Sequence, residues 1–175
     1  MYYDPGYGNY TLNNRGVIAY NDFRQDVPQQ DVFDINTNIQ QALSLIEDAV
    51  KGETEDRLFY QYMIGIAPSS QDKDIIAGIR DDEMKHFQMF RQLYTELTGA
   101  PVPEGQQASF ERPASYCAGL YKALMGEQNA VVRYRKILYA MRDRRHINML
   151  VEIITDELRH FGLYNYLYSK NKCGV

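Results

Sequence analysis

Two five-residue segments of the chain repeat one unusual combination of charged side chains. Residues 82–86 read DEMKH and residues 156–160 read DELRH, so each segment places a Glu and a His three positions apart. On a helix, positions i and i+3 lie on one face, and a carboxylate beside an imidazole is a ligand set that suits iron or manganese. The pattern therefore indicates metal-ion chemistry at four residues: Glu83, His86, Glu157 and His160.

The repetition extends well beyond these two segments. A shift of 74 residues places the first half of the chain on the second half, so that Glu53 falls on Glu127 and Tyr60 falls on Tyr134. A Glu or His buried in a helical core costs free energy unless a partner or a metal ion offsets it. A purely structural duplication would need only the apolar positions and turns, so the repeated polar residues favour a chemical role.

Helix geometry brings the repeated carboxylates to one height. Glu53 precedes the end of its predicted helix by 14 residues and Glu83 follows the start of the next by 12, which correspond to about 21 Å and about 18 Å of rise. Glu127 and Glu157 repeat these counts in the second half. Four carboxylates left together would repel one another, whereas two divalent ions would balance a charge of −4 with +4.

The elements that must position these residues are helices. Apolar residues recur at spacings of three and four from Asp31 onward, and Pro68 and the Gly- and Pro-rich segment 99–113 interrupt them. The predicted helices span about 34–67, 71–98, 114–141 and 143–169, with Ser69 or Ser70 as the expected N-cap of the second helix and Asp143 as that of the fourth. The predicted fold class is all-α, an antiparallel four-helix bundle made of two duplicated helical hairpins that a crossover loop joins.

The chain divides by composition into an N-terminal arm and a helical domain. Residues 1–30 contain five Tyr, three Gly and two Pro, with several Asn and little apolar periodicity. This composition is typical of a tail or arm, which either covers its own bundle or serves assembly. Residues 31–175 form the predicted bundle.

Composition also excludes several partners. The 19 basic and 23 acidic residues give a net charge of −4 without a dense basic run, so nucleic acid is not an expected partner. No apolar run reaches the roughly 20 residues that span a bilayer. The N-terminus lacks a signal-peptide pattern, which predicts a cytoplasmic location. Cys117 and Cys173 form no CxxC pair, so both are interpreted as structural or incidental.

The ligand pattern resembles that of ferritin-like di-iron carboxylate proteins, in which two helices each supply a Glu and two others each supply Glu-x-x-His. It looks most like rubrerythrins, because a Gly-Glu step precedes a Tyr by seven residues in both halves. The resemblance covers about residues 34–170. It implies a ferritin-like bundle that binds two iron ions, with manganese as the alternative. The implied ligands are Glu53, Glu83, His86, Glu127, Glu157 and His160.

The resemblance also implies roles for the neighbours of these ligands. Glu83 and Glu157 would bridge the two ions. Asp82 and Asp156 would each accept the free N–H of a ligating His on a facing helix; the alternative is a solvated acid. Tyr60 and Tyr134 would pack beside the centre and hydrogen-bond a ligand, and His146, which lacks a repeat counterpart, is interpreted as a surface or capping residue.

Two departures from rubrerythrins limit the comparison. Rubrerythrins carry an extra Glu three residues after the third-helix ligand, whereas Ala130 stands here. Its repeat counterpart is Asp56, which we interpret as a speculative seventh carboxylate from the first helix. The rubredoxin module with its CxxC pairs is missing, so an external electron donor protein is expected.

The expected function is that of a non-haem di-iron oxidoreductase. It would react with hydrogen peroxide or dioxygen and oxidise Fe(II), as in rubrerythrin-like peroxide reduction or ferroxidase chemistry. Manganese catalase activity uses nearly the same ligands, and the sequence does not separate these reactions.

The sequence also predicts assembly into an oligomer. Aromatic residues on the helix faces exceed what one bundle needs, which predicts a homodimer or larger homo-oligomer; they are Phe87, Phe90, Tyr94, Phe161, Tyr164 and Tyr168. The alternative function is a structural or coat-type assembly protein that retains a ferritin-like metal-binding fold. The composition of the arm supports this alternative, because Tyr-rich segments suit stacking and cross-linking between subunits.

Overall fold

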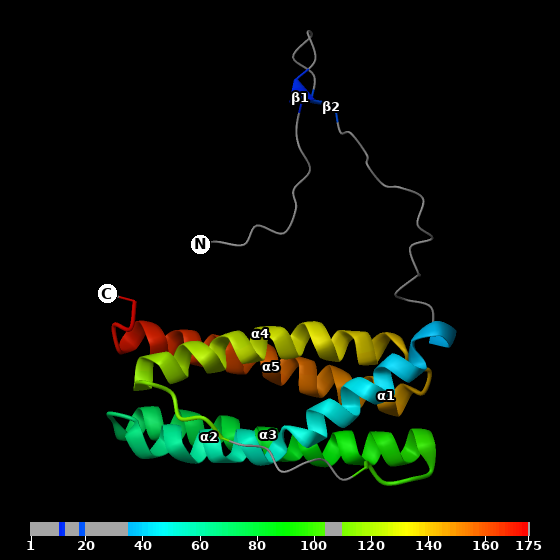
Figure 1. Ribbon diagram of the computed structural model, residues 1–175, viewed down its shortest axis with the longest axis horizontal. Coiled ribbons are helices and arrows are strands. Elements are labelled where there is room, and N and C mark those ends of the chain that lie inside the picture. The colour runs from blue at the N-terminus through cyan, green and yellow to red at the C-terminus, as the bar shows by residue number, and fades with distance from the viewer. Residues whose placement is uncertain (1–10, 13–17, 20–34, 104–109, 175) are drawn as a thin grey trace. The chain divides into compact units, whose positions relative to one another are not determined.

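Five helices form the main body of the chain in the computed structural model (Figure 1). The structure describes residues 11–12, 18–19, 35–103 and 110–174. The helices are α1 (Ile35–Lys51), α2 (Glu53–Ile66), α3 (Ser70–Thr98), α4 (Tyr116–Tyr139) and α5 (Arg144–Lys170). The prediction of an all-α fold is confirmed for this body, which belongs to a unit from Val32 to Val175.

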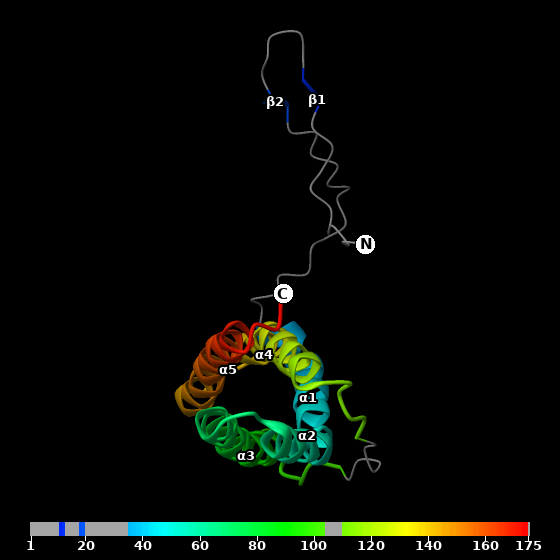
Figure 2. The same cartoon turned by 90° about the vertical axis from the view of Figure 1, so that its left-hand side faces the viewer.

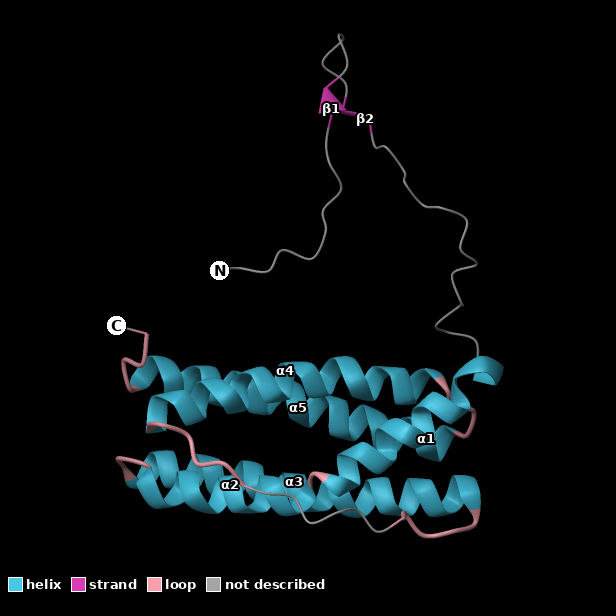
Figure 3. Cartoon of the chain, in the orientation of Figure 1, coloured by secondary structure: helices cyan, strands magenta, loops and turns pink. Residues whose placement is uncertain are grey.

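The residues before this unit form a unit of their own, Met1–Asp31. Its described part consists of two short strands, β1 (Thr11–Leu12) and β2 (Ile18–Ala19), which pair antiparallel (Figure 3). The sequence did not predict this pairing. The rest of the arm predicted at residues 1–30 lies outside the described residues, and so does the assembly role suggested for it.

The first predicted helix is two helices rather than one. α1 ends at Lys51 and α2 begins at Glu53, with Gly52 between them at φ −71° and ψ −16°. The hydrogen bonds continue across this residue, because its N–H bonds to the Asp48 carbonyl and its own carbonyl accepts from Asp56. Glycine has a low helix propensity, which is compatible with a helix boundary at this position. Gly126, the repeat counterpart, leaves α4 unbroken.

The other helix ends follow the predicted capping residues. The Ser69 hydroxyl accepts the backbone N–H of Asp72 at the start of α3, and the Asp143 carboxylate accepts that of Arg145 at the start of α5. α3 ends at Gly99, whose φ of 73° is the left-handed conformation that glycine adopts readily. These local signals explain why the boundaries of α3 and α5 were predictable.

The helices surround a common interior (Figure 2). α2 packs against α3, α4 packs along α5, and α1 contacts both α3 and α4. Two apolar clusters fill this interior. One contains Phe90 and Ile137, and the other contains Ile76 and Leu120. Along α3, α4 and α5, buried polar residues occupy the positions between the two clusters.

A disulfide and a buried carboxylate join the helix ends at one end of the body. Cys117 at the start of α4 is bonded to Cys173 just after α5. Beside it, the fully buried Asp72 accepts hydrogen bonds from Tyr116 at 3.0 Å and from Asn171 at 2.7 Å, and it also contacts Lys170. Both cysteines are therefore structural in this fold.

The aromatic residues that motivated the oligomer prediction lie mostly inside the chain. Phe87, Phe90, Tyr94 and Tyr164 are at most 9% exposed, because their helix faces pack against neighbouring helices. These four residues therefore offer little surface to a second subunit, and the oligomer stays a prediction. Among the described residues, no helix is long and apolar enough to span a membrane.

Candidate metal centre

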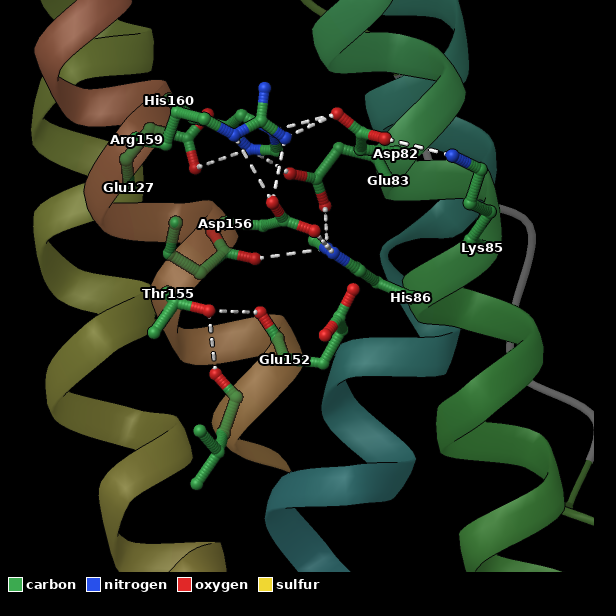
Figure 4. Close-up of polar contacts among 12 residues, drawn as sticks. Asp82, Glu83, Lys85, His86, Glu127, Glu152, Thr155, Asp156, Arg159 and His160 are labelled. Carbon is green, nitrogen blue, oxygen red and sulfur yellow. Dashed lines mark hydrogen bonds and ion pairs between the residues drawn. The ribbon is translucent and has the colours of Figure 1, made fainter. Parts of the chain in front are cut away.

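Five charged or titratable residues meet in the interior between the two apolar clusters (Figure 4). α3 supplies Glu83 and His86, α4 supplies Glu127, and α5 supplies Glu157 and His160. All five are at most 8% exposed. Atoms of Glu83, Glu127, Glu157 and His160 lie within 4.8 Å of one another, close enough to share a metal ion.

The two histidines are held in a reciprocal arrangement by aspartates of the facing helix. Nε2 of His86 on α3 lies 3.2 Å from Asp156 on α5, and Nε2 of His160 on α5 lies 3.4 Å from Asp82 on α3 (Figure 4). This geometry is the one expected for the two aspartates. A carboxylate at Nε2 favours the proton on that nitrogen and leaves the lone pair of Nδ1 available to a metal ion.

Both Nδ1 atoms face the buried glutamates. Nδ1 of His160 lies 3.0 Å from Oε1 of Glu83, and Nδ1 of His86 lies 3.1 Å from Oε1 of Glu157. The His86 and Glu157 atoms are not aligned for a hydrogen bond, and both are buried without a hydrogen-bond partner among the described residues. A lone pair that faces a carboxylate oxygen is repulsive unless a proton or a cation lies between them.

The pKa values of this cluster show how the metal-free chain handles its charge. Burial opposes a charge on His86, but the adjacent carboxylates of Glu157 and Glu83 outweigh it and raise the pKa to about 10. Burial also opposes the charge on Glu83, yet the two histidines lower its pKa. For Glu127, burial and the neighbouring Glu157 both raise the pKa well above its usual value. Protons therefore take the place that cations would occupy.

Arg159 completes the outer side of the centre, and the sequence analysis missed it. Its guanidinium lies 2.7 Å from Asp82 and 2.6 Å from Asp156, so it joins the two aspartates that hold the histidines. Burial opposes ionisation of Asp82, but hydrogen bonds from Arg159 and Lys85 hold its pKa well below the usual range. A signal was present, because Arg159 and Lys85 occupy equivalent positions of the repeat.

Glu53, predicted as a ligand, is not brought to the cluster. Its carboxylate is paired with Arg91 of α3 and its side chain is 33% exposed. It lies directly after the break at Gly52, at the first position of α2. Arg91 is equivalent to Asn165 in the second half of the repeat, so no equivalent arginine holds Glu127 away from the interior.

A cavity of about 210 Å³ opens beside the cluster, between α2 and α4. Glu83, Glu127 and Glu157 form part of its wall together with Asp56 of α2. Asp56 is solvent-accessible as a residue, but partial burial of its carboxyl group and then the charge of Glu83 raise its pKa to about 6.

The remaining predicted residues take peripheral places. Tyr60 and Tyr134 line the same cavity, and burial followed by the glutamate charges raises the pKa of both phenols. His146 lies away from the centre, 2.7 Å from Glu96, as a partly buried residue near the start of α5. It was interpreted as a surface or capping residue, and it contributes nothing to the cluster.

Comparison with known proteins shows a shared fold and indicates no activity. No protein-family model matches this chain. The uncharacterized protein YhjR of Bacillus subtilis (strain 168) is 26% identical over 121 residues, which cover 69% of this chain and 82% of YhjR. A solved structure of a hypothetical protein from Pyrococcus furiosus matches with a TM-score of 0.65 at 18% identity, over 77% of this chain and 93% of that one. This likeness shows a common fold alone.

Proposed function

We propose that the chain is a non-haem di-iron oxidoreductase, which binds two metal ions between α2, α3, α4 and α5 and reacts with hydrogen peroxide or dioxygen. The observation that carries the proposal is the arrangement of the two histidines. Each has Nε2 at an aspartate of the facing helix and Nδ1 at buried glutamates, so that both metal-binding nitrogens converge on one cluster of carboxylates.

The donor set fits iron, with manganese as the alternative. Imidazole nitrogen and carboxylate oxygen suit these ions better than they suit thiolate-seeking metals. His86, His160, Glu83, Glu127 and Glu157 would hold them, and the unpaired Nδ1 of His86 and Oε1 of Glu157 would gain partners. The proposal thus removes a repulsion that the metal-free chain relieves only with protons.

The proposal includes the finer classification of the fold. We infer a ferritin-like four-helix bundle of the rubrerythrin type, in which α1 and α2 together take the place of the first helix. The internal repeat supports this inference, because it relates Glu83 and His86 to Glu157 and His160 on helices that contact each other. This classification is a proposal, because the two similar proteins are described as uncharacterized and as hypothetical.

The protein itself would control the access of reactants to the metal ions and the orientation of the ligands. Bound iron would supply the electrons and the Lewis acidity for reduction of a peroxide or dioxygen O–O bond. The cavity of about 210 Å³ admits only small reactants to Glu127 and Glu157. Arg159 and the two aspartates hold the histidine rings in one orientation, and the apolar clusters on both sides limit water. An external protein would supply electrons for repeated turnover.

The proposal is tested by anaerobic titration of the metal-free protein with Fe(II). We expect saturation near two irons per chain, and then oxidation of the loaded protein by peroxide and by oxygen in separate rapid-mixing experiments. Faster oxidation by peroxide supports a peroxidase, and faster oxidation by oxygen supports a ferroxidase. His160→Ala should lose binding, whereas His146→Ala should keep it. Absence of binding by the unmodified chain would exclude the proposal.

A further inference from the structure

We propose that Asp56, and not Glu53, supplies the α2 ligand to the metal centre. This inference rests on the proposed function, because it presupposes that the cluster binds metal. The repeat alone would choose Glu53, the counterpart of Glu127. The tertiary structure reverses this choice, because Glu53 and Asp56 lie one turn apart on α2 and, of these two, Asp56 lines the cavity beside the cluster.

The surroundings of Glu53 direct it away from the cluster. Its carboxylate pairs with the guanidinium of Arg91 on α3, and both side chains are partly exposed to solvent, 33% and 48% respectively. It is absent from the wall of the cavity that reaches the glutamates, as far as the described residues define that wall. A carboxylate that arginine already neutralises is a poor competitor for a metal ion in the interior.

The surroundings of Asp56 direct it towards the cluster. It shares the cavity wall with Glu83, Glu127 and Glu157. Oε1 of Glu157 and Nδ1 of His86 lie 3.1 Å apart in the cluster, and both are buried without a hydrogen-bond partner among the described residues, which is an independent sign that the cluster accommodates a cation. Glu55 of α2 also lines the cavity, but it pairs with Lys122 at 3.5 Å, which leaves Asp56 as the candidate ligand from α2.

The repeat explains why there is room for Asp56 to act as a ligand. Ala130 on α4 is the counterpart of Asp56 and lines the same cavity. One acid and one small residue thus face the cavity from the two equivalent positions, and the small residue leaves room for the acid and its ion. The second half of the chain thus supplies Glu127, the counterpart of Glu53. The first half supplies Asp56, the counterpart of Ala130.

Charge balance calls for a fourth carboxylate, and the charge of Glu53 is already paired with that of Arg91. Glu83, Glu127 and Glu157 carry −3 when ionised, whereas two divalent ions carry +4. Asp56 raises the acidic charge to −4, so that the ions and their ligands are neutral as a group. Buried charge that is not balanced in this way is strongly disfavoured.

The test compares Asp56→Asn with Glu53→Gln, two neutral variants of nearly unchanged shape. Cobalt(II) serves as the probe, and binding is followed anaerobically by visible absorption and by calorimetry. For the unmodified chain we expect two ions. Asp56→Asn should weaken the second ion at least 10-fold and alter its absorption bands, whereas Glu53→Gln should bind both ions within about two-fold of the unmodified affinity.

Other results separate failure of this inference from failure of the proposed function. If the unmodified chain binds two ions and Asp56→Asn does so equally well, Asp56 is no ligand and only this inference is overturned. Loss of an ion in Glu53→Gln also overturns it, whatever Asp56→Asn does. If the unmodified chain binds no cobalt(II), iron(II) or manganese(II), the proposed function falls and this inference with it. Circular dichroism verifies that both variants are folded.

Discussion

At the scale of single residues, the centre is defined by how two imidazole rings are oriented. A buried histidine has two nitrogens with different tasks, and the one that carries the proton is set by its hydrogen-bond partner. Asp156 and Asp82 each sit one position before a glutamate of the cluster, so that one helical segment supplies both a buried carboxylate and the aspartate for the histidine opposite. Each of the two segments thereby supplies the aspartate that contacts the histidine of the other segment.

Removal of one aspartate should weaken metal binding without removing a ligand. In Asp156→Ala, the proton on Nε2 of His86 loses its acceptor at 3.2 Å, and loss of such a partner typically lowers metal affinity about 10- to 100-fold. Calorimetric titration with Mn(II) measures the change. Asp81→Ala is the matched control, because Asp81 is exposed and pairs only with Arg80. Equal affinities of the two variants would contradict the assigned role.

Metal binding should release protons and strengthen as pH rises. His86 has a pKa raised to about 10 and is protonated at neutral pH in the metal-free chain, but only its neutral form binds a metal. Between pH 6.5 and 10 the affinity should therefore increase about 10-fold per pH unit for each proton displaced. Calorimetry in buffers of different ionisation enthalpy counts these protons. An affinity that is independent of pH would show that Nδ1 is not a ligand.

The same pKa has the opposite consequence for stability of the metal-free chain. Because the folded-state pKa of His86 lies above its unfolded value of about 6.5, the charged ring stabilises the fold below pH 6.5. This contribution is lost as pH rises towards 10. Binding and stability therefore respond to pH in opposite directions, and metal at high pH should restore what the lost proton supplied.

At the scale of elements, the ends of three helices are joined by one buried carboxylate. Asp72 in the first turn of α3 receives hydrogen bonds from Tyr116 at the start of α4 and from Asn171 just after α5. Lys170 near the end of α5 pairs with it as well. Burial opposes its ionisation, but these partners hold the pKa of Asp72 well below its usual range. The negative charge thus fixes the register of α3 against the ends of α4 and α5.

Loss of this carboxylate should destabilise the chain. Asp72→Ala leaves Lys170 without its buried partner, and breaking a buried ion pair costs about 3 kcal/mol. Because the folded-state pKa is depressed, the contribution of Asp72 is present above about pH 4 and is lost as pH falls further. Urea unfolding of the unmodified chain and of Asp72→Ala at pH 7 and pH 3 checks both statements. A difference that is the same at both pH values would contradict the charged role.

At the scale of the whole molecule, the Cys117–Cys173 disulfide closes the end of the body that Asp72 organises. The bond spans 56 residues, and cross-linking a loop of this length stabilises a fold by about 4 kcal/mol in the chain-entropy description. It lies in the part of the chain around the second apolar cluster, against which Cys173 packs. The Glu/His cluster lies between the two apolar clusters and shares no residue with the disulfide.

Removal of the disulfide should lower stability and leave metal binding intact. We expect the double variant Cys117→Ser, Cys173→Ser to unfold at lower temperature than the unmodified chain when both are metal-free, and to bind Mn(II) with unchanged affinity. Calorimetric unfolding and titration measure the two properties. Reduction of the unmodified chain with dithiothreitol should reproduce the loss of stability. A parallel loss of metal affinity would show that the two ends of the body are coupled.

Sequence reasoning succeeded where the decisive interactions are local. The helical class, the capping serine at position 69 and the pairing of a Glu with a His three residues on all follow from the spacing of residues along one helix. The cross-helix contacts between the aspartates and histidines were also expected, but from the resemblance to ferritin-like di-iron proteins rather than from spacing alone. Periodicity depends on residues that lie close together in the sequence, so it can be recognised without knowledge of the tertiary fold.

The tertiary structure alone decided which side chains complete the centre. Glu53 pairs with Arg91, whereas Asp56 lines the cavity beside the cluster, and neither arrangement can be read from spacing. The guanidinium of Arg159 and the disulfide were likewise visible only after the helices had been packed. The physical reason is that a side chain chooses among partners on other helices, and a small change in helix rotation or bending exchanges one partner for another.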